Sequence, residues 1–321
     1  MSLSLGFDNF AVRALGWKAP QLVDYAASLK VDVLLLSDLD VFESLDDRSL
    51  RELKARAGAS GIALHVGTGS ICPTSSMFDP RRGTAAEHLR TAIRVARALG
   101  SPVARCFLGS GEDRATHGGI GTHIENTIAT CKEARSFAID SDVKIAIENH
   151  AGDLQSWELE KLIEKAGREY VGATMDSGNA TWTLEDPMDS LERLGPYAVT
   201  TGIRDSMVWE SLRGVSVQWV AMGEGLVDWK AYVKRFEELC PRTPFILEII
   251  TGGPREFAFR ENDFWNEWPS ISMLDLGRFL ALSKRGRPLP PAPGEQADFQ
   301  KSTLEAGLRY CREVLGLGLK D

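Results

Sequence analysis

Short apolar segments alternate along this chain with longer segments whose apolar residues recur at helical spacing. Between residues 85 and 100, for example, Leu89, Ile93, Ala96 and Leu99 fall on one helical face, and Gly100 is suited to end the helix. Strands separated by amphipathic helices favour parallel βαβ units. The apolar segments are LSLGF (3–7), VDVLLL (31–36), IALHV (62–66), VARCFL (103–108), VKIAIE (143–148), VGATMD (171–176), AVTTGIR (198–204) and FILEII (245–250).

Eight such units predict an α/β fold of the (β/α)8 TIM-barrel type, which we place at residues 1–285. The segment RGRPLPPAPG (285–294) contains four prolines and is expected to be extended. One more helical pattern follows, at about residues 298–315. We therefore expect residues 286–321 to form a proline-rich linker and a C-terminal helix that packs on the barrel or on a partner subunit.

Composition narrows the class of protein. The chain has 321 residues, 43% hydrophobic and 26% charged, as in ordinary globular proteins. A net charge of −8 argues against a nucleic-acid partner, and no apolar run is long enough to suggest a membrane span. The five cysteines form no C-x-x-C pair, and the N-terminus has no signal-peptide pattern. We expect a cytoplasmic protein with reduced thiols.

Acidic residues stand where three of the predicted strands end. Glu148 ends the fifth apolar segment, Asp176 ends the sixth, and Glu248 lies within the eighth. The C-terminal ends of barrel strands converge on one site, where three carboxylates would repel one another. A divalent cation would offset that repulsion, and oxygen ligands favour Mn²⁺ or Mg²⁺. The other interpretation is that these acids form ion pairs with Arg105 and Arg204.

Five short motifs give this chain a resemblance to a known family. In order, IENH (147–150), MDSGN (175–179), GIRDS (202–206), GEGLVDW (223–229) and LEI (247–249) resemble the motifs of xylose-isomerase-like TIM barrels, the sugar phosphate isomerase/epimerase superfamily. The resemblance extends over about residues 3–285. It implies one divalent metal held by Glu148, Asp176 and Glu248, and acid–base roles for Glu148 and Glu248. His150 follows the metal-binding glutamate in many relatives, where it is catalytic or supports the ligand.

One position departs from the family pattern. The family places a metal-binding histidine on the seventh strand, where this chain has Gly202. Gln218 or His150 as a substitute ligand, an additional water, or loss of the metal would each account for the change. The abasic-site endonucleases of the same superfamily are disfavoured, because they use several histidines in a metal cluster and bind a phosphate backbone, whereas this chain is acidic.

Other polar residues at the strand ends have two open interpretations each. His65 ends the third apolar segment and serves either as an acid or substrate ligand, or as a core histidine. Arg105 and Arg204 either bind a carboxylate or phosphate of the substrate or pair with the site acids. Asn149 and Asn179 either bind substrate hydroxyls or fix loops. An aromatic cluster at residues 257–269 either caps the site or is buried structurally.

The resemblance and the acidic residues together favour a divalent-metal-dependent isomerase or epimerase. Its substrate would be a small sugar or keto sugar acid, and the reaction would pass through an enediolate. The first alternative is a metal-dependent lyase, a decarboxylase or dehydratase, acting on a keto sugar acid. The second alternative is a non-catalytic sugar-binding barrel. The expected partner is a small carbohydrate, and homo-oligomer formation stays open.

Overall fold

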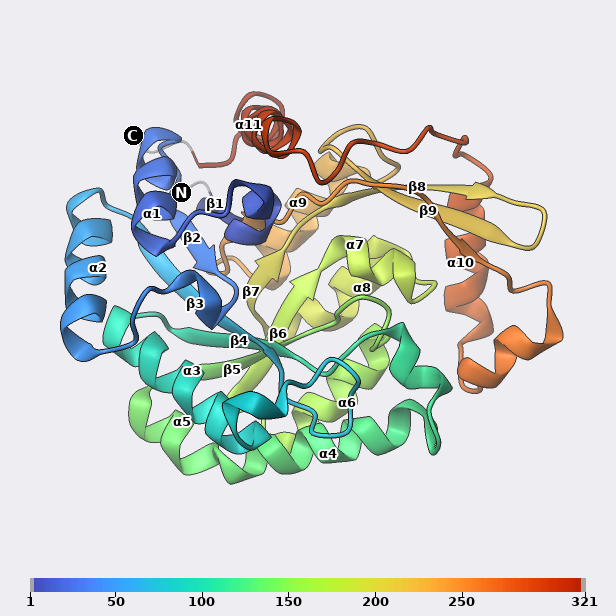
Figure 1. Cartoon of the computed structure of the whole chain (residues 1–321). Coiled ribbons are helices and arrows are strands. Elements are labelled where there is room, and N and C mark those ends of the chain that lie inside the picture. The colour runs from blue at the N-terminus through green and yellow to red at the C-terminus, as the bar shows by residue number, and fades with distance from the viewer. Residues whose placement is uncertain (1–2, 319–321) are drawn as a thin grey trace.

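The computed structural model describes residues 3–318 and contains a barrel of parallel strands surrounded by helices (Figure 1). The predicted (β/α)8 fold is confirmed, and each apolar segment contributes one barrel strand. In the sheet, neighbouring strands follow the order β10-β1-β2-β3-β4-β5-β6-β7. Their bounds are β1 Leu5–Asp8, β2 Val33–Leu36, β3 Ala63–Ser70, β4 Val103–Phe107, β5 Lys144–Glu148, β6 Val171–Asp176, β7 Ala198–Gly202 and β10 Phe245–Leu247.

The barrel closes between β7 and β10 through a few backbone contacts. The Ile203 N–H donates to the Ile246 carbonyl at 2.7 Å, and the Glu248 N–H donates to the Ile203 carbonyl at 2.9 Å. Ile203 and Leu247 form an isolated parallel bridge. This closure places Gly202 and Arg204 beside Glu248, at the C-terminal ends of both strands.

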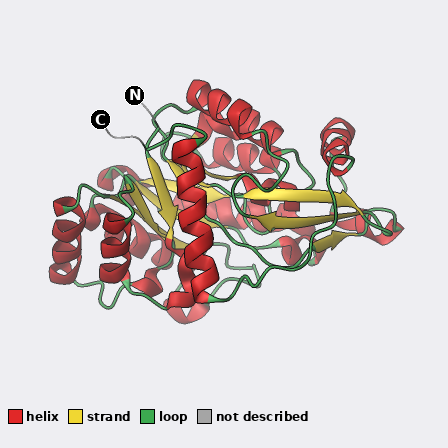
Figure 2. Cartoon of the chain, turned by 90° about the horizontal axis from the view of Figure 1, so that it is seen from above, coloured by secondary structure: helices red, strands yellow, loops and turns green. Residues whose placement is uncertain are grey.

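Helices cover the outside of the barrel, as Figure 2 shows from above. The helix predicted between residues 85 and 100 is confirmed as α3: Thr84 caps its start together with Glu87, and Gly100 ends it with φ 78°. The helices are α1 Ala19–Ser28, α2 Asp47–Ala59, α3 Ala85–Leu99, α4 Gly119–Glu133, α5 Arg135–Ser141, α6 Ser156–Ala166, α7 Ser177–Trp182, α8 Pro187–Leu194, α9 Trp229–Leu239, α10 Met273–Ser283 and α11 Ala297–Glu313.

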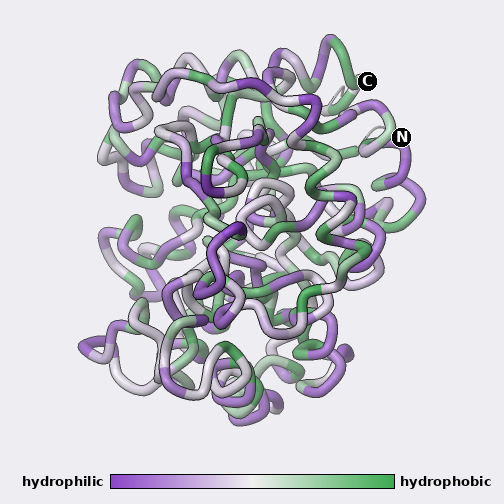
Figure 3. Tube along the Cα trace, turned by 90° about the vertical axis from the view of Figure 1, so that its right-hand side faces the viewer, coloured by the Kyte–Doolittle hydropathy of each residue, from purple (hydrophilic) through white to green (hydrophobic). Residues whose placement is uncertain are grey.

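Alternation along each strand decides which side chains face the site. On β5, Ile145 and Ile147 belong to the main core with the helices, so Ala146 and Glu148 face the barrel interior. Val33, Leu35 and Ile246 form a separate apolar cluster inside the barrel. Hydrophobic and hydrophilic residues accordingly alternate along the chain in Figure 3 rather than forming separate blocks.

A small antiparallel sheet extends sideways from the barrel (Figures 1 and 2). It has the order β11-β9-β8, with β8 Asp205–Glu210, β9 Val215–Val220 and β11 Arg255–Phe257. Strands β8 and β9 were not predicted, because polar residues interrupt the apolar ones in SMVWE and SVQWV and no helical pattern separates the two strands. With α10 they enclose a second core that contains Val208, Val217, Phe257 and Phe279.

The C-terminal helix α11 packs on the N-terminal part of the chain. Leu304, Leu308 and Cys311 belong to the main core. Tyr25 on α1 donates a hydrogen bond to Glu305 at 3.0 Å, and Arg312 donates to the Leu29 carbonyl at 2.7 Å. In Figure 2, α11 is the helix nearest the viewer.

Across residues 3–318, the structure contains no helix that combines the length and the apolarity needed to cross a membrane.

Candidate active site

Three buried carboxylates meet at the C-terminal end of the barrel. Glu148 ends β5, Asp176 ends β6, and Glu248 directly follows β10. Each contributes one oxygen to a group whose members all lie within 4.8 Å of one another. Their exposed fractions are 1%, 0% and 4%. The acidic residues singled out in the sequence therefore converge in space; we call them the triad.

Arg105 on β4 pairs with the first member of the triad. Its Nε and Nη2 lie 2.6 Å and 2.5 Å from Oε2 of Glu148. The other oxygen of Glu148, Oε1, accepts a hydrogen bond from Nδ2 of Asn179 at 3.0 Å. Both oxygens of Glu148 are thus held by protein donors, which fixes the carboxylate and offsets its desolvation.

Arg204 bridges the other two members. Its Nη2 donates to Oδ2 of Asp176 and, at 2.7 Å, to Oε2 of Glu248. Burial raises the pKa of Asp176 well above its usual range, and the positive charge of Arg204 opposes that shift. Arg105 and Arg204 therefore form ion pairs with the site acids, as one of the two interpretations of the sequence expected.

Asn149 and Asn179 fix the loops around the triad. The Nδ2 of Asn149 donates to the Asp176 carbonyl, and the Asp176 N–H donates to Oδ1 of Asn149, both at 2.9 Å. The Asn179 N–H donates to Oδ1 of Asp176 at 2.7 Å. These contacts lock the end of β5 to the end of β6. A role for either amide in substrate binding stays a prediction.

His150 is a neutral imidazole with a defined tautomer. Burial lowers its pKa to about 3, and Arg105 acts in the same direction. Nδ1 lies 2.7 Å from the Gly109 carbonyl, so Nδ1 carries the proton and Nε2 has a free lone pair. The ring stacks on Phe107 with 3.8 Å between centroids. The free Nε2 can accept a hydrogen bond, although so low a pKa makes the ring a weak base at neutral pH. The catalytic role of His150 stays a prediction.

His65 lies inside the barrel on β3. Its Nδ1 is 2.9 Å from Oγ1 of Thr200 on β7, and burial lowers its pKa to about 4. The contact with Thr200 gives Nδ1 a hydrogen-bond partner, as expected for a core histidine. Its predicted role in substrate binding stays a prediction.

This burial makes a pH effect testable. The pKa of His65 is about 4 in the fold and 6.5 without it. Between these values the unfolded chain binds more protons, so stability should fall as pH falls from 6.5 to 4, by up to about 1.4 kcal/mol per pH unit. Urea unfolding at pH 7, 6 and 5 should show a smaller fall for His65→Asn than for the wild type. Equal slopes would contradict a neutral buried His65.

Gln218 lies on β9, outside the parallel barrel. Its Nε2 donates to the carbonyls of Gly252 and Pro290, both at 2.9 Å. Its Oε1 is buried and accepts no hydrogen bond from residues 3–318. The amide thus joins the loop after β10 to the proline-rich segment. Its proposed role as a substitute metal ligand stays a prediction.

Asp8 is a further buried acid close to Glu248 and Arg105, and it was not singled out from the sequence. It ends β1 and is 0% exposed. Burial raises its pKa to about 8, repulsion from Glu248 adds to the shift, and Arg105 opposes it. The signal was present, because LGFD ends an apolar strand with an acid, as the fifth and sixth segments do.

A column of stacked side chains leads away from the triad. The guanidinium of Arg204 lies 4.4 Å from the centroid of Trp219, which stacks on Trp182 at 3.9 Å. Arg255 lies on Trp182 at 4.6 Å and also faces Phe257 at 5.2 Å. Trp182, Arg255 and Phe257 line a cavity of about 200 Å³. Trp182, Trp219 and Arg255 were not singled out in the sequence, since only the fold brings them together.

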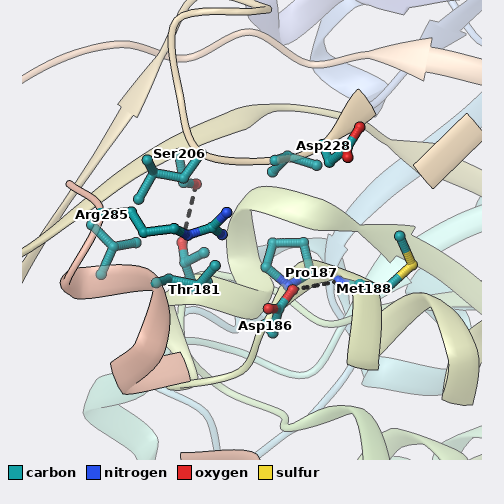
Figure 4. A pocket seen from close by; sticks show the side chains of 11 residues that line it. Thr181, Asp186, Pro187, Met188, Ser206, Asp228 and Arg285 are labelled. Carbon is teal, nitrogen blue, oxygen red and sulfur yellow. Dashed lines mark hydrogen bonds between the residues drawn. The ribbon is translucent and has the colours of Figure 1, made fainter. Parts of the chain in front are cut away.

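Another cavity, of about 120 Å³, lies between α7, α8 and β8 (Figure 4). Thr181 and Ser206 share a hydrogen bond of 3.1 Å on one side of it. Asp186, Asp228 and Arg285 also line it, and no member of the triad does.

Asp205 connects two of the sequence motifs through hydrogen bonds. Its carboxylate accepts the N–H groups of Gly223 and Gly225 at 3.0 Å and the indole N–H of Trp229 at 2.8 Å. GIRDS is therefore tied to GEGLVDW. These contacts fix the segment between β7 and β8 that presents Arg204.

The donor set of the triad could bind a divalent cation. Three carboxylate oxygens within 4.8 Å of one another are suitable ligands for such an ion. At Gly202, an added Cβ would lie 2.9 Å from Oε2 of Glu248 and 3.0 Å from Oδ2 of Asp176. A side chain at Gly202 would thus point at two triad oxygens, where the resemblance places a histidine ligand.

The comparisons with known proteins identify the family of this barrel. The family model described as "Xylose isomerase-like TIM barrel" matches residues 12–267, so the chain belongs to this family. The 3-oxo-isoapionate decarboxylase of Pectobacterium atrosepticum is 22% identical over 212 residues, which cover 65% of this chain and 70% of the relative.

Two solved structures have the same fold. D-psicose 3-epimerase from Clostridium cellulolyticum H10 is 16% identical, with a TM-score of 0.59 over 88% of this chain and 99% of the epimerase. The IolI protein with a bound zinc atom is 13% identical, with a TM-score of 0.61 over 89% of this chain and 100% of IolI. At these identities the likeness establishes the fold.

The Gly202 position gives a second test. Gly202→His should raise the affinity for Mn²⁺, because the imidazole would point toward the oxygens of Asp176 and Glu248. It should lower turnover if the space at Gly202 admits a substrate group. Parallel Mn²⁺ titrations of variant and wild type check the first effect. Unchanged affinity would mean that another residue, such as Gln218, already occupies the position, or that the alignment of GIRDS with the family motif is shifted.

Proposed function

We propose that the chain is an isomerase or epimerase that moves a proton at the carbon beside the carbonyl of a small sugar or keto sugar acid. The observation that carries this proposal is the buried convergence of Glu148, Asp176 and Glu248 at the ends of three barrel strands. Membership of the xylose isomerase-like family and the fold shared with D-psicose 3-epimerase support a sugar substrate.

Glu248 and Glu148 are the proposed acid–base pair, and their surroundings differ. Both oxygens of Glu148 accept hydrogen bonds, from Arg105 and Asn179. Glu248 accepts from Arg204 through Oε2, while its Oε1 accepts none from residues 3–318. A carboxylate with an uncommitted oxygen is the better proton acceptor. Glu248 is therefore the proposed base, and Glu148 returns a proton from its side of the substrate.

Cationic groups surround the place where negative charge would develop. Arg105 and Arg204 are proposed to bind the substrate oxygens together with Asn149, Asn179 and His65, and His150 to accept or relay a proton through Nε2. A divalent ion, Mn²⁺ or Mg²⁺, would be held by the triad, with Gln218 as a further candidate. When bound, it supplies Lewis-acid polarisation of the substrate carbonyl.

A lyase is the second candidate. Decarboxylation of a keto acid leaves an electron pair that cationic groups must stabilise, and two buried guanidinium groups already contact the triad. The 3-oxo-isoapionate decarboxylase among the relatives supports the same chemistry. In this version the C–C bond to the carboxylate breaks, carbon dioxide leaves, and a site acid protonates the remaining carbon.

One experiment separates the two. A panel of ketoses and keto sugar acids is incubated with the protein and Mn²⁺ in D₂O and followed by NMR, with carbon dioxide release measured in parallel. Deuterium at the carbon beside the carbonyl without loss of carbon supports the isomerase or epimerase. Carbon dioxide release supports the lyase. Neither signal with any member of the panel would contradict both and favour a non-catalytic barrel.

A further inference from the structure

The guanidinium of Arg204 lies between two of the triad carboxylates, where a bound cation would be expected. A single nitrogen, Nη2, donates to Oδ2 of Asp176 and to Oε2 of Glu248. The residue is 2% exposed. Asp176 and Glu248 are two of the three carboxylates that could hold a metal. The guanidinium therefore binds two of the three carboxylates that a divalent ion would need.

Two glycines make room for this arrangement. A Cβ at Gly202, two residues before Arg204, would crowd the same oxygens of Asp176 and Glu248. A Cβ at Gly178 on α7 would overlap Cγ of Arg204. On its other side the guanidinium rests against Trp219, 4.4 Å from the ring centroid. The chain thus encloses a passage through which the arginine reaches the triad.

The charges on these residues are nearly balanced without a metal. As carboxylates, Glu148, Asp176 and Glu248 contribute three negative charges, against the two positive charges of Arg105 and Arg204. Addition of a divalent ion would leave the group positively charged in a buried, low-dielectric setting. Like charges in such a setting repel strongly. With the ion bound and Arg204 withdrawn, the three carboxylates, Arg105 and the ion would together be neutral, so withdrawal of Arg204 favours binding of the ion.

The arginine is also incompletely held. Nε of Arg204 is buried and donates to no group within residues 3–318. Only Nη2 bonds to the triad, without the paired contact that a guanidinium makes with one carboxylate in a bidentate bridge. Withdrawal of the side chain would therefore break two hydrogen bonds, both made through Nη2.

We propose that Arg204 is the resident cation of the triad and that divalent ions compete with it for Asp176 and Glu248. The site then has two exclusive states, one with the guanidinium between the two carboxylates and one with a metal ion there. Metal affinity of the wild-type chain is weak as a result. This goes beyond the proposed function, because it concerns which cation occupies the site and holds for either reaction.

The test is Mn²⁺ binding to the full chain, measured by the electron paramagnetic resonance signal of free Mn²⁺. Arg204→Met should raise the affinity at least about tenfold, because it removes the competing charge and frees two ligands. The matched control is Arg114→Met, since Arg114 is also buried and pairs with Glu158, which is not part of the triad. Its Mn²⁺ affinity should equal that of the wild type. Equal affinity of Arg204→Met and the wild type would overturn the proposal.

A second variant keeps every charge. Gly178→Ala places a methyl group against Cγ of Arg204 and should push the guanidinium away from the triad, again raising Mn²⁺ affinity. If Arg204→Met is too unstable to titrate, thermal unfolding with and without Mn²⁺ replaces the titration. The ion should then raise the melting temperature of both variants more than that of the wild type, and an equal rise would overturn the proposal. Because these measurements do not use turnover, they are independent of whether the proposed reaction is correct.

Discussion

Glu248→Gln should lower kcat at least about 100-fold on whichever substrate the NMR panel identifies, because positioned acid–base catalysis alone contributes about 10² to 10⁴ in rate. Glutamine has nearly the same shape but neither accepts a proton at neutral pH nor carries the charge that pairs with Arg204. Steady-state kinetics measure the effect, and circular dichroism checks that the barrel is still folded. A variant that keeps more than about a tenth of wild-type kcat would exclude Glu248 as the base.

Glu185→Gln is the matched control for this experiment. Glu185 is also buried, at 1% exposure, and accepts hydrogen bonds from the backbone and hydroxyl of Ser156. Burial raises the pKa of Glu185 to about 7, so a large fraction of this side chain is already protonated at neutral pH. The neutral glutamine resembles that protonated form. Glu185 is not part of the triad. Its kcat should stay within a few-fold of the wild type, which separates loss of the base from loss of any buried carboxylate.

Arg105→Met should destabilise the fold by about 3–5 kcal/mol, because removal of one partner of a buried ion pair leaves an uncompensated charge. The side chains of Arg105 and Glu148 are 6% and 1% exposed, and Arg105 also donates to the Thr68 carbonyl at 3.3 Å. The free energy of unfolding from urea titration, at neutral pH and without metal, measures the loss.

The control for stability is Arg56→Met. Arg56 pairs with Asp24 on the surface, with side chains 50% and 55% exposed, and such pairs contribute about 0.2–1 kcal/mol. A loss for Arg105→Met as small as that of the control would mean that Glu148 becomes protonated or hydrated at little cost. The charge balance described for the triad would then be wrong.

Much of the fold followed from local patterns. The eight barrel strands coincide with short, mainly apolar segments separated by helical patterns, because strands covered on both faces are rich in apolar residues. The hairpin of β8 and β9 was missed because Ser206, Ser216 and Gln218 interrupt its apolar residues and no helical pattern separates its two strands. Its position depends on packing against α10 and on β11, which no local pattern indicates.

The sequence by itself determined the barrel and the gathering of Glu148, Asp176 and Glu248. In parallel strands the residue that ends an apolar run must lie at the C-terminal edge, and closure of the barrel brings those edges together. Only the tertiary structure decided what neutralises the three acids. That Arg204 crosses to Asp176 and Glu248, while Arg105 holds Glu148, depends on side-chain reach across strands far apart in sequence. The space at Gly202 and Gly178 that admits the Arg204 side chain exists only after the strands and α7 have packed. The sequence could therefore suggest the ion pairs as one interpretation but could not decide between the two.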